Sequence, residues 1–224
     1  MQSTVNIANT IRGSQIYLYS TQVKIHGDII QNLYNISNKT INVAPEEEKL
    51  NKIIRNVDIG GGIDFVSCKN IKINNLKIEK CNLGYGGAIY LYNSTMKITN
   101  SELNKNIAEG FGGGIYSADN NCEIELYNTK ITNNSTKDGS GGGIYAYGNL
   151  IIDGENTLIS NNEAGTYGGG IVVKTQCLIK NCVICKNKAL KNCGGGICVD
   201  GNLLLEKAKI FLNSCKEIGG GIYY

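Results

Sequence analysis

The side chains in this sequence best suited to recognition chemistry are tyrosines. The chain of 224 residues has thirteen of them, three Phe and no Trp. A set that follows isoleucines at fixed spacing is predicted to form a ligand-binding surface: Tyr90, Tyr92, Tyr116, Tyr145 and Tyr147. A tyrosine ring offers a flat apolar body and a polar tip at low entropic cost, which suits contact with a protein or a glycan. A structural interpretation stays open, because stacked tyrosines also stabilise neighbouring strands.

Nine cysteines form a second candidate group, for which three uses are open. The local spacing of a plant-type iron–sulfur site is matched by Cys177, Cys182, Cys185 and Cys215. Disulfides are possible within or between adjacent repeats, as for Cys193 with Cys198, or Cys182 with Cys215, although an odd count argues against a complete framework. Because Cys177 stands where other repeats have Met96 or Leu203, we expect buried free thiols that act as small apolar fillers, with no metal ion and no cofactor.

Acid–base catalysis needs converging carboxylates, and one pair merits consideration. Glu109 and Asp138 each lie three residues before a glycine triplet, so in adjacent repeats they could approach the spacing of a retaining glycosidase pair. Counted from Asn106 and Asn134, they fall out of register by one residue. His26, the only histidine, is expected to be an exposed strand residue. We therefore predict a non-catalytic protein, with a polysaccharide lyase or hydrolase as the lesser alternative.

Composition limits the classes of partner. The net charge of +3 comes from 22 basic and 19 acidic residues that form no basic stripe, so we expect no nucleic-acid partner. We find no stretch of eighteen apolar residues, and the N-terminus lacks the basic and apolar regions of a signal peptide. Direct membrane insertion is therefore not expected, and the compartment is unknown.

A glycine repeat defines the elements that would position these side chains. Tetrapeptides of the form Gly-Gly-Gly-Ile or Gly-Gly-Ala-Ile hold twenty of the 29 glycines. They end, about 26 residues apart, at Ile63, Ile89, Ile115, Ile144, Ile171, Ile197 and Ile222. A fixed period of this length is the signature of a solenoid. Each tetrapeptide would form a tight corner stacked on the corner of the next repeat.

Within each repeat the apolar residues alternate with polar ones. Ile89 and Leu91 alternate with Tyr90 and Tyr92, which is the period of a β-strand. About three short strands are expected per repeat, and stacked repeats would share one core. The predicted fold class is all-β, a parallel β-helix that we expect to be right-handed. The tyrosines would then line one outer strand face, interrupted at Asp64, Val172 and Cys198.

Two rows of asparagine are predicted to mark further corners. One row consists of Asn75, Asn100, Asn128, Asn156 and Asn181, and the other of Asn106, Asn134, Asn162, Asn187 and Asn213. Asparagine tolerates left-handed backbone, and amides stacked about 4.8 Å apart could bond one another along the axis. We expect two asparagine ladders with a structural role.

The chain divides into three predicted segments. Residues 1–33 hold a degenerate coil, because GSQIYLYS around Ile16 aligns with GGAIYLYN around Ile89. Residues 34–58 interrupt the repeat, and PEEEKLNKIIRN, residues 45–56, is predicted to form a short helix that could cap the solenoid. Residues 59–224 form the repeated coils. We expect them to leave an open C-terminal strand edge, which would invite self-association.

The tetrapeptide GG[GA]I, as at residues 86–89, and the motif [IL]xxN, as at residues 131–134, resemble the repeats of the polymorphic outer membrane proteins of chlamydial autotransporter adhesins. The resemblance covers about residues 60–224, and Ile or Leu stands where those proteins have Phe. It implies a β-helical protein, at the cell surface or outside the cell, that presents a strand face to a protein or glycan. We find no signal peptide in this chain that would support that location. A structural self-assembly module is the competing expectation.

Overall fold

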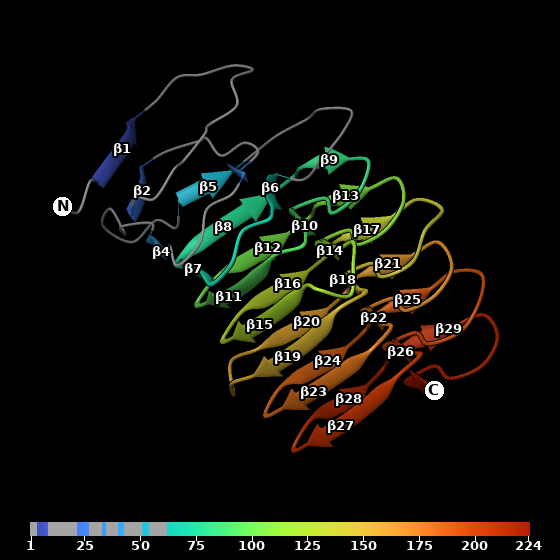
Figure 1. The fold of residues 1–224 in the computed structure, drawn as a ribbon. Helices are drawn as coiled ribbons and strands as arrows, with labels where there is room; N and C mark the ends of the chain where they lie inside the picture. Colours follow the sequence, from blue (N-terminus) through green and yellow to red (C-terminus); the bar gives the residue numbers. More distant parts are fainter. Residues whose placement is uncertain (1–3, 9–21, 27–32, 35–39, 43–50, 54–61) are drawn as a thin grey trace.

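A computed structural model gives the fold and describes residues 4–8, 22–26, 33–34, 40–42, 51–53 and 62–224. The described residues form thirty short strands and no helix, so none of them lies in a helix that could cross a membrane. The strands form four parallel sheets, which we name A to D. Figure 1 shows them stacked coil upon coil from the N-terminal to the C-terminal end.

Sheets A and B contain the longer rows of strands. In order, sheet A consists of β1 (Thr4–Ala8), β2 (Gln22–His26), β4 (Thr40–Asn42), β7 (Ile71–Asn74), β11 (Thr95–Thr99), β15 (Glu123–Tyr127), β19 (Asn149–Asp153), β23 (Gln176–Lys180) and β27 (Asn202–Glu206). Sheet B consists of β3 (Leu33–Tyr34), β6 (Ile63–Val66), β10 (Ile89–Tyr92), β14 (Ile115–Ser117), β18 (Ile144–Ala146), β22 (Ile171–Val173), β26 (Ile197–Val199) and β30 (Ile222–Tyr223).

Sheets C and D complete each coil. Sheet C consists of β5 (Asn51–Ile53), β8 (Leu76–Glu79), β12 (Glu102–Asn104), β16 (Lys130–Thr132), β20 (Leu158–Ser160), β24 (Val183–Cys185) and β28 (Lys209–Phe211). Sheet D consists of the two-residue strands β9 (Asn82–Leu83), β13 (Ile107–Ala108), β17 (Ser135–Thr136), β21 (Glu163–Ala164), β25 (Lys188–Ala189) and β29 (Ser214–Cys215). A coil thus has four strands, one more than the three predicted.

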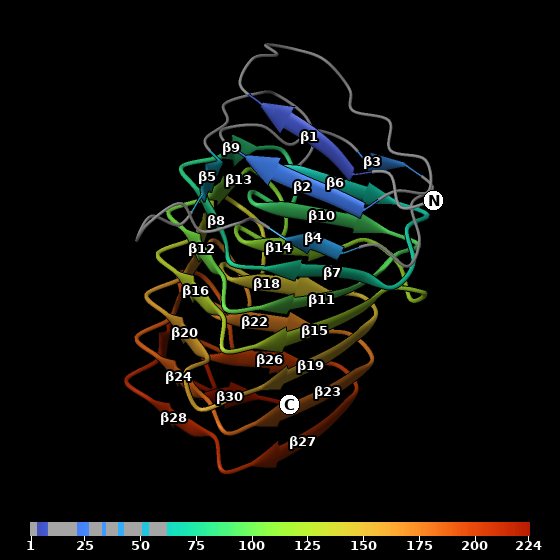
Figure 2. The ribbon, with the colours of Figure 1, turned by 90° about the vertical axis from the view of Figure 1, so that its left-hand side faces the viewer.

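The glycine tetrapeptides set the register between coils. Ile89 pairs with Ile115 and Ile115 with Ile144, and each strand runs parallel to its equivalent one coil later. The chain winds around one axis in both views (Figure 1 and Figure 2), so the fold is a parallel β-helix. The fold class expected from the period is confirmed.

The core lies inside the coils and consists of stacked aliphatic rows. Ile89, Leu91 and Ile98 are fully buried, as are their equivalents in the neighbouring coils. Strand β11 alternates between buried and half-exposed residues, as period two requires. Because no strand buries its inward face alone, the stability of each coil depends on the coils beside it.

The glycine corner is needed for two reasons. Gly112 has a φ of +65°, a left-handed conformation that costs a residue with a Cβ atom free energy. A Cβ on the next residue, Gly113, would collide with the carbonyl oxygen of Gly142 in the following coil. The triplet therefore allows both the turn and the close stacking of successive turns.

One of the two predicted asparagine ladders exists. The side-chain amide of Asn106 donates to Oδ1 of Asn134 at 2.9 Å, and Asn134 donates to Oδ1 of Asn162 at 3.1 Å. The row continues through Asn187 to Asn213, and Asn106, Asn134, Asn162 and Asn187 are buried. Each amide also bonds backbone, as Asn134 does with the carbonyl of Leu103. This ladder satisfies polar groups that the corner would otherwise bury without partners.

The other predicted ladder is wrong. Asn75, Asn100, Asn128 and Asn181 have positive φ, between 46° and 57°. The side-chain amide of Asn181 donates to Asp153 and not to the next asparagine of the row. The amide of Asn100 instead donates to Asn74, the residue before the corner in the neighbouring coil. At this corner the backbone conformation selects asparagine. In the coil with the two-residue insertion, Gly154 at φ +105° occupies the left-handed position instead of Asn156.

The predicted N-terminal helix is corrected where the structure describes it. Asn51–Ile53 form strand β5, which pairs with β8 in sheet C. Pairing with an adjacent coil outweighs the local helical pattern there. The rest of the predicted helix lies outside the described residues, as do most of residues 1–33. The domain boundaries stay predictions.

Candidate functional site

The outer face of sheet B gathers most of the predicted tyrosines. Tyr90 and Tyr116 have ring centroids 5.7 Å apart in a tilted arrangement, and Tyr116 and Tyr145, also 5.7 Å apart, meet edge to face, so the rings contact one another from coil to coil. Tyr147 contacts Tyr145 at 5.3 Å. Four of the five predicted residues therefore form one continuous contact series.

Two further aromatic residues belong to this group but escaped the sequence prediction. Phe111 lies 4.7 Å from Tyr145, and Tyr85 lies 5.6 Å from Tyr116. Both stand one residue before the glycines of a tetrapeptide, as GYGG and GFGG. This fixed position could have indicated their role, because the corner that follows brings the side chain to the outer face beside the strand. We name the six rings the aromatic cluster: Tyr85, Tyr90, Phe111, Tyr116, Tyr145 and Tyr147.

Exposure separates residues that a partner can touch from those beneath them. Tyr145 is only 5% exposed, whereas Tyr85 and Tyr92 are each 47% exposed. Tyr92, the fifth predicted residue, ends β10 at the margin of the cluster. Tyr145 therefore supports the other rings, and Tyr85, Tyr90, Tyr92 and Tyr116 offer the accessible surface.

Burial raises the pKa of three tyrosine hydroxyl groups in the cluster. It raises the pKa of Tyr116 to about 12, with smaller contributions from Tyr147 and Tyr90. It also raises the pKa of Tyr90 and Tyr145 above the ordinary value. Neutral phenol groups both donate and accept hydrogen bonds, so the cluster combines apolar ring faces with uncharged polar tips.

A hollow follows the aromatic cluster toward the C-terminal coils. It has a volume of about 520 Å³, and its lining includes Ser140, Tyr145, Tyr167, Val172, Cys198 and Tyr223. Lys174 and Asp200 also line it and form an ion pair at 3.2 Å. The sequence prediction noted that Val172 and Cys198 interrupt the tyrosine row, but it did not foresee that the interruption opens a hollow.

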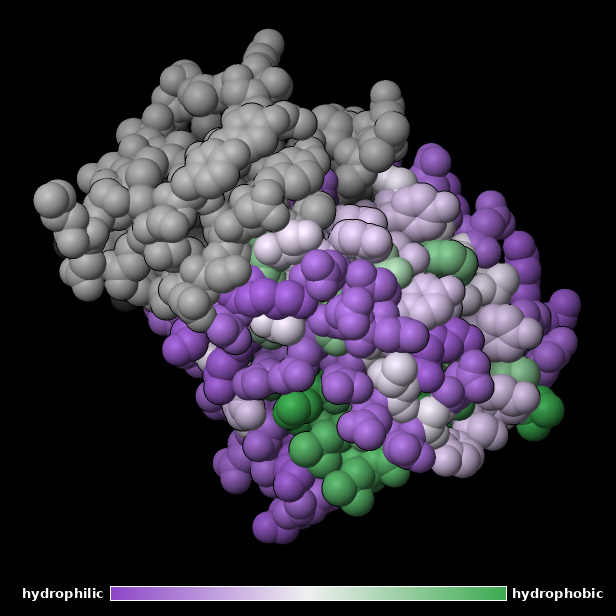
Figure 3. Space-filling view, in the orientation of Figure 1, coloured by the Kyte–Doolittle hydropathy of each residue, from purple (hydrophilic) through white to green (hydrophobic). Residues whose placement is uncertain are grey.

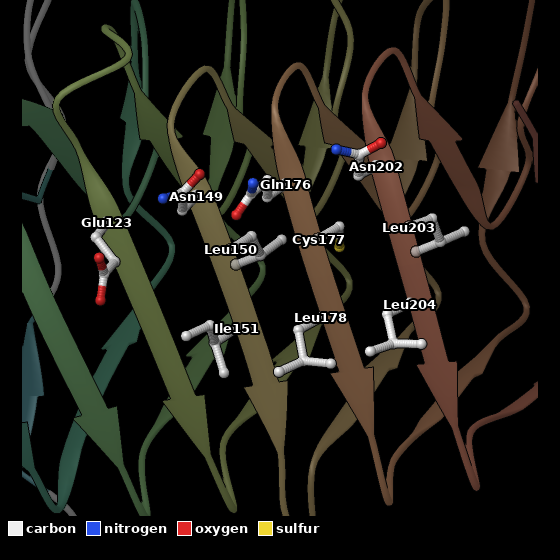
Figure 4. Close-up of a pocket in the computed structure, with 10 residues that line it drawn as sticks. All are labelled: Glu123, Asn149, Leu150, Ile151, Gln176, Cys177, Leu178, Asn202, Leu203 and Leu204. Atoms are coloured by element: carbon white, nitrogen blue, oxygen red, sulfur yellow. The ribbon is translucent and has the colours of Figure 1, made fainter.

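A second recess lies on the outer face of sheet A, in a different part of each coil. Ile151, Leu178 and Leu204 stand side by side on β19, β23 and β27, with Asn149, Gln176 and Asn202 two residues before them (Figure 4). Its volume is about 350 Å³. Figure 3 shows apolar side chains gathered over the coils around β23 and β27. This aliphatic groove contrasts with the aromatic face of sheet B.

The cysteines occupy core and corner positions, and all nine are free thiols. Cys177 and Cys182 are buried, and burial raises the pKa of each thiol to about 12. The predicted role as apolar fillers fits Cys177, whose side chain belongs to the hydrophobic core. Within the described residues, no three His, Cys, Asp or Glu side chains converge as metal ligands would.

The candidate carboxylate pair is engaged elsewhere. Glu109 forms an ion pair with Lys137 at 3.0 Å, and Asp138 forms one with Lys191 at 3.1 Å. All four side chains are more than half exposed. The two acids do lie in adjacent coils, but each faces solvent beside its own lysine. The side chain of His26 lies outside the described residues.

The coil geometry, the stacked corners and the asparagine ladder together define a parallel β-helix repeat protein. Residues 61–224 match the family described as the right-handed β-helix region, so the chain belongs to that family, and the helix is right-handed. No curated protein and no solved structure matched the chain.

Proposed function

We propose that this protein is a non-catalytic β-helix that binds a protein or a glycan through the outer face of sheet B. The observation that carries the proposal is the aromatic cluster, in which six rings from three coils contact one another on one outer face. Aromatic rings with polar tips dominate the energetics of many recognition surfaces.

The scaffold supports binding because it holds the rings in place before a partner arrives. The backbones of Tyr90, Tyr116 and Tyr145 are fixed by the parallel pairing of β10, β14 and β18. Tyr145 is packed under Phe111 and Tyr116, so little side-chain freedom is left to lose there. A surface ordered in advance costs less conformational entropy to bind.

We extend the proposal to the biological setting. The glycine and asparagine motifs resemble those of the polymorphic outer membrane proteins, which are surface adhesins. On that resemblance, the protein acts at a cell surface or outside the cell, and its partner is a component of another surface. The family match covers the same coils and is compatible with this role.

The exposed tyrosines provide the test. A variant with Tyr85→Ser, Tyr90→Ser and Tyr92→Ser removes three of the four accessible rings and leaves Tyr116, Tyr145 and Phe111 in place. Binding is measured by biolayer interferometry on immobilised oligosaccharides and purified cell-surface glycoproteins. We expect the triple variant to lose at least about tenfold in affinity.

The chain offers a matched control. Tyr127 lies on the outer face of sheet A, where its ring contacts the ammonium group of Lys97 at 4.1 Å. Tyr127→Ser removes one outward ring from a different face and is expected to bind as the unmodified protein does. A folded triple variant that keeps full affinity would exclude the outer face of sheet B as the binding surface.

A self-assembly module is the second candidate. Among the described strands, β27, β28, β29 and β30 each pair on one side only. The adjoining side chains Leu205, Leu212 and Ile218 are exposed. A second copy that added its strands to these edges would bury them. Sedimentation velocity tests this candidate, because it requires a mass that rises with concentration, and a monomer at all concentrations would exclude it.

A further inference from the structure

We propose that the hollow between Tyr145 and Tyr223 is a sugar-binding subsite that accommodates an uncharged pyranose unit. The proposal deepens the function proposed above, since it names the ligand class and places it at one end of the aromatic face. Recognition would combine stacking on the exposed rings of Tyr167 and Tyr223 with hydrogen bonds to the polar groups of the lining.

The hollow lies where two small side chains interrupt the row of outward tyrosines on sheet B. Tyr145 pairs with Val172, Val172 with Cys198, and Cys198 with Tyr223, so these residues occupy the same outward position in four successive coils. Two small side chains thus separate two tyrosines. Three steps between strands place the backbones of Tyr145 and Tyr223 about 14 Å apart. Their rings bound the hollow along the axis of the solenoid.

The sides of the hollow are polar. Ser140 and Tyr167 precede the glycine corner and lie on one side, where the Ser140 hydroxyl is 2.6 Å from that of Thr166. Lys174 and Asp200 follow the strands of sheet B and lie on the other side. Hydroxyl, ammonium and carboxylate groups give both donors and acceptors, and a carboxylate bonded to one lysine keeps acceptor sites for further hydrogen bonds.

The charge balance favours a neutral ligand. Lys174 and Asp200, the two charged side chains of the lining, compensate each other at 3.2 Å. Burial raises the pKa of the Cys198 thiol, which keeps it neutral as well. A hydroxyl-rich ring with apolar C–H faces suits a site with exposed aromatic rings, polar groups and two charged side chains that compensate each other.

The size also fits a small ligand. A volume of about 520 Å³ lies within the roughly 300–1,000 Å³ of small-molecule sites. Val172, only 2% exposed, lies at the base of the hollow and gives it an apolar floor. A sugar unit bound there would continue the line of rings that begins with Tyr90.

The fold itself provides the variant that tests the proposal. Val172→Tyr restores the tyrosine that the row lacks and fills the hollow. The backbone accepts it, because Tyr145 and Tyr223 stand beside Gly141 and Gly219 as Val172 stands beside Gly168. Leu178→Tyr is the matched control, since it adds the same ring at an outward position of β23 in sheet A.

A second pair of variants tests the polar side. Asp200→Ala removes the carboxylate that faces the hollow, and Asp138→Ala removes the carboxylate of another exposed lysine ion pair. The probes are methyl glycosides of glucose, galactose, mannose and N-acetylglucosamine and their di- and trisaccharides. Binding is measured by saturation-transfer difference NMR and by calorimetric titration.

The expected result is that at least one probe binds, that Val172→Tyr and Asp200→Ala weaken it by about tenfold or more, and that both controls bind as the unmodified protein does. The proposal is overturned if no probe binds, or if Val172→Tyr binds a probe with unchanged affinity. Either of these two results would still allow a partner to bind elsewhere on the outer face of sheet B. Failure of the general function would show instead as unchanged binding by the Tyr85, Tyr90 and Tyr92 variant.

Discussion

The inward and outward faces of sheet B belong to the same strands and obey different constraints. The inward row repeats one residue through seven coils, from Ile63 to Ile222. The outward row changes from Asp64 through three tyrosines to Val172, Cys198 and Tyr223. The second inward row varies more, from Phe65 through Ser117 to Val199, but all its side chains stay buried because each packs on its equivalents in neighbouring coils. Variation outside leaves the fold intact, so function is to be sought there.

The largest loss of stability is expected from a change in the buried asparagine ladder. In Asn134→Ala, the backbone N–H of Asn106 loses its acceptor at 2.9 Å and the carbonyl of Leu103 loses its donor. Both groups are buried, so we expect the free energy of unfolding to fall by about 3 kcal/mol or more. Urea denaturation followed by circular dichroism measures the change. A loss below about 1 kcal/mol would show that the ladder adds little to stability.

The tyrosines of the outer face give a smaller, pH-dependent effect. Burial raises the pKa of Tyr116 to about 12, so the folded protein holds this proton more tightly than the unfolded chain does. Stability is therefore unaffected by this group below about pH 10 and falls as the pH rises from about 10 to 12. Urea denaturation across that range measures the fall.

Tyr116→Phe isolates the contribution of this hydroxyl. The variant keeps the ring that contacts Tyr90 and Tyr145 and removes the titrating proton. We expect its stability to fall less steeply with pH than that of the unmodified protein, while lysines affect both proteins alike. Identical slopes for the two proteins would contradict the raised pKa of Tyr116.

The smallest change in the free energy of unfolding is expected at the exposed corner that contains Asn128. Asn128 has a φ of +47°, and its role is to adopt this conformation. Asn128→Gly is expected to change the free energy of unfolding by less than about 0.5 kcal/mol, and Asn128→Ala to lower it by about 1 kcal/mol. Equal effects of Gly and Ala would mean that the side chain of Asn128, and not its backbone, stabilises the corner.

The sequence predicted the fold well because the fold is periodic. One interval of about 26 residues, visible in the glycine tetrapeptides, determines the coils, the register and the inward face. The pattern could not distinguish the two asparagine rows, since the same residue serves hydrogen bonding at Asn134 and backbone conformation at Asn128. That distinction depends on burial, which a one-dimensional repeat does not contain.

The candidate site was predictable only in part. The alternation of strands placed Tyr90, Tyr116 and Tyr145 on one face, but it could not show that neighbouring rings cover Tyr145. The place of Phe111 depends on how the glycine corner turns. The hollow depends on side chains from four coils and two corners acting together. Such a surface is set by three-dimensional packing, and each residue alone carries little of the signal.

The most direct measurement compares binding and stability in the variant with Tyr85→Ser, Tyr90→Ser and Tyr92→Ser. Affinity for the best-binding oligosaccharide or glycoprotein is determined beside the free energy of unfolding of the same sample. We predict an affinity loss of at least about tenfold, while the variant stays folded and loses no more than about 2 kcal/mol. A folded variant that binds with unchanged affinity would contradict the assignment of recognition to the outer face of sheet B.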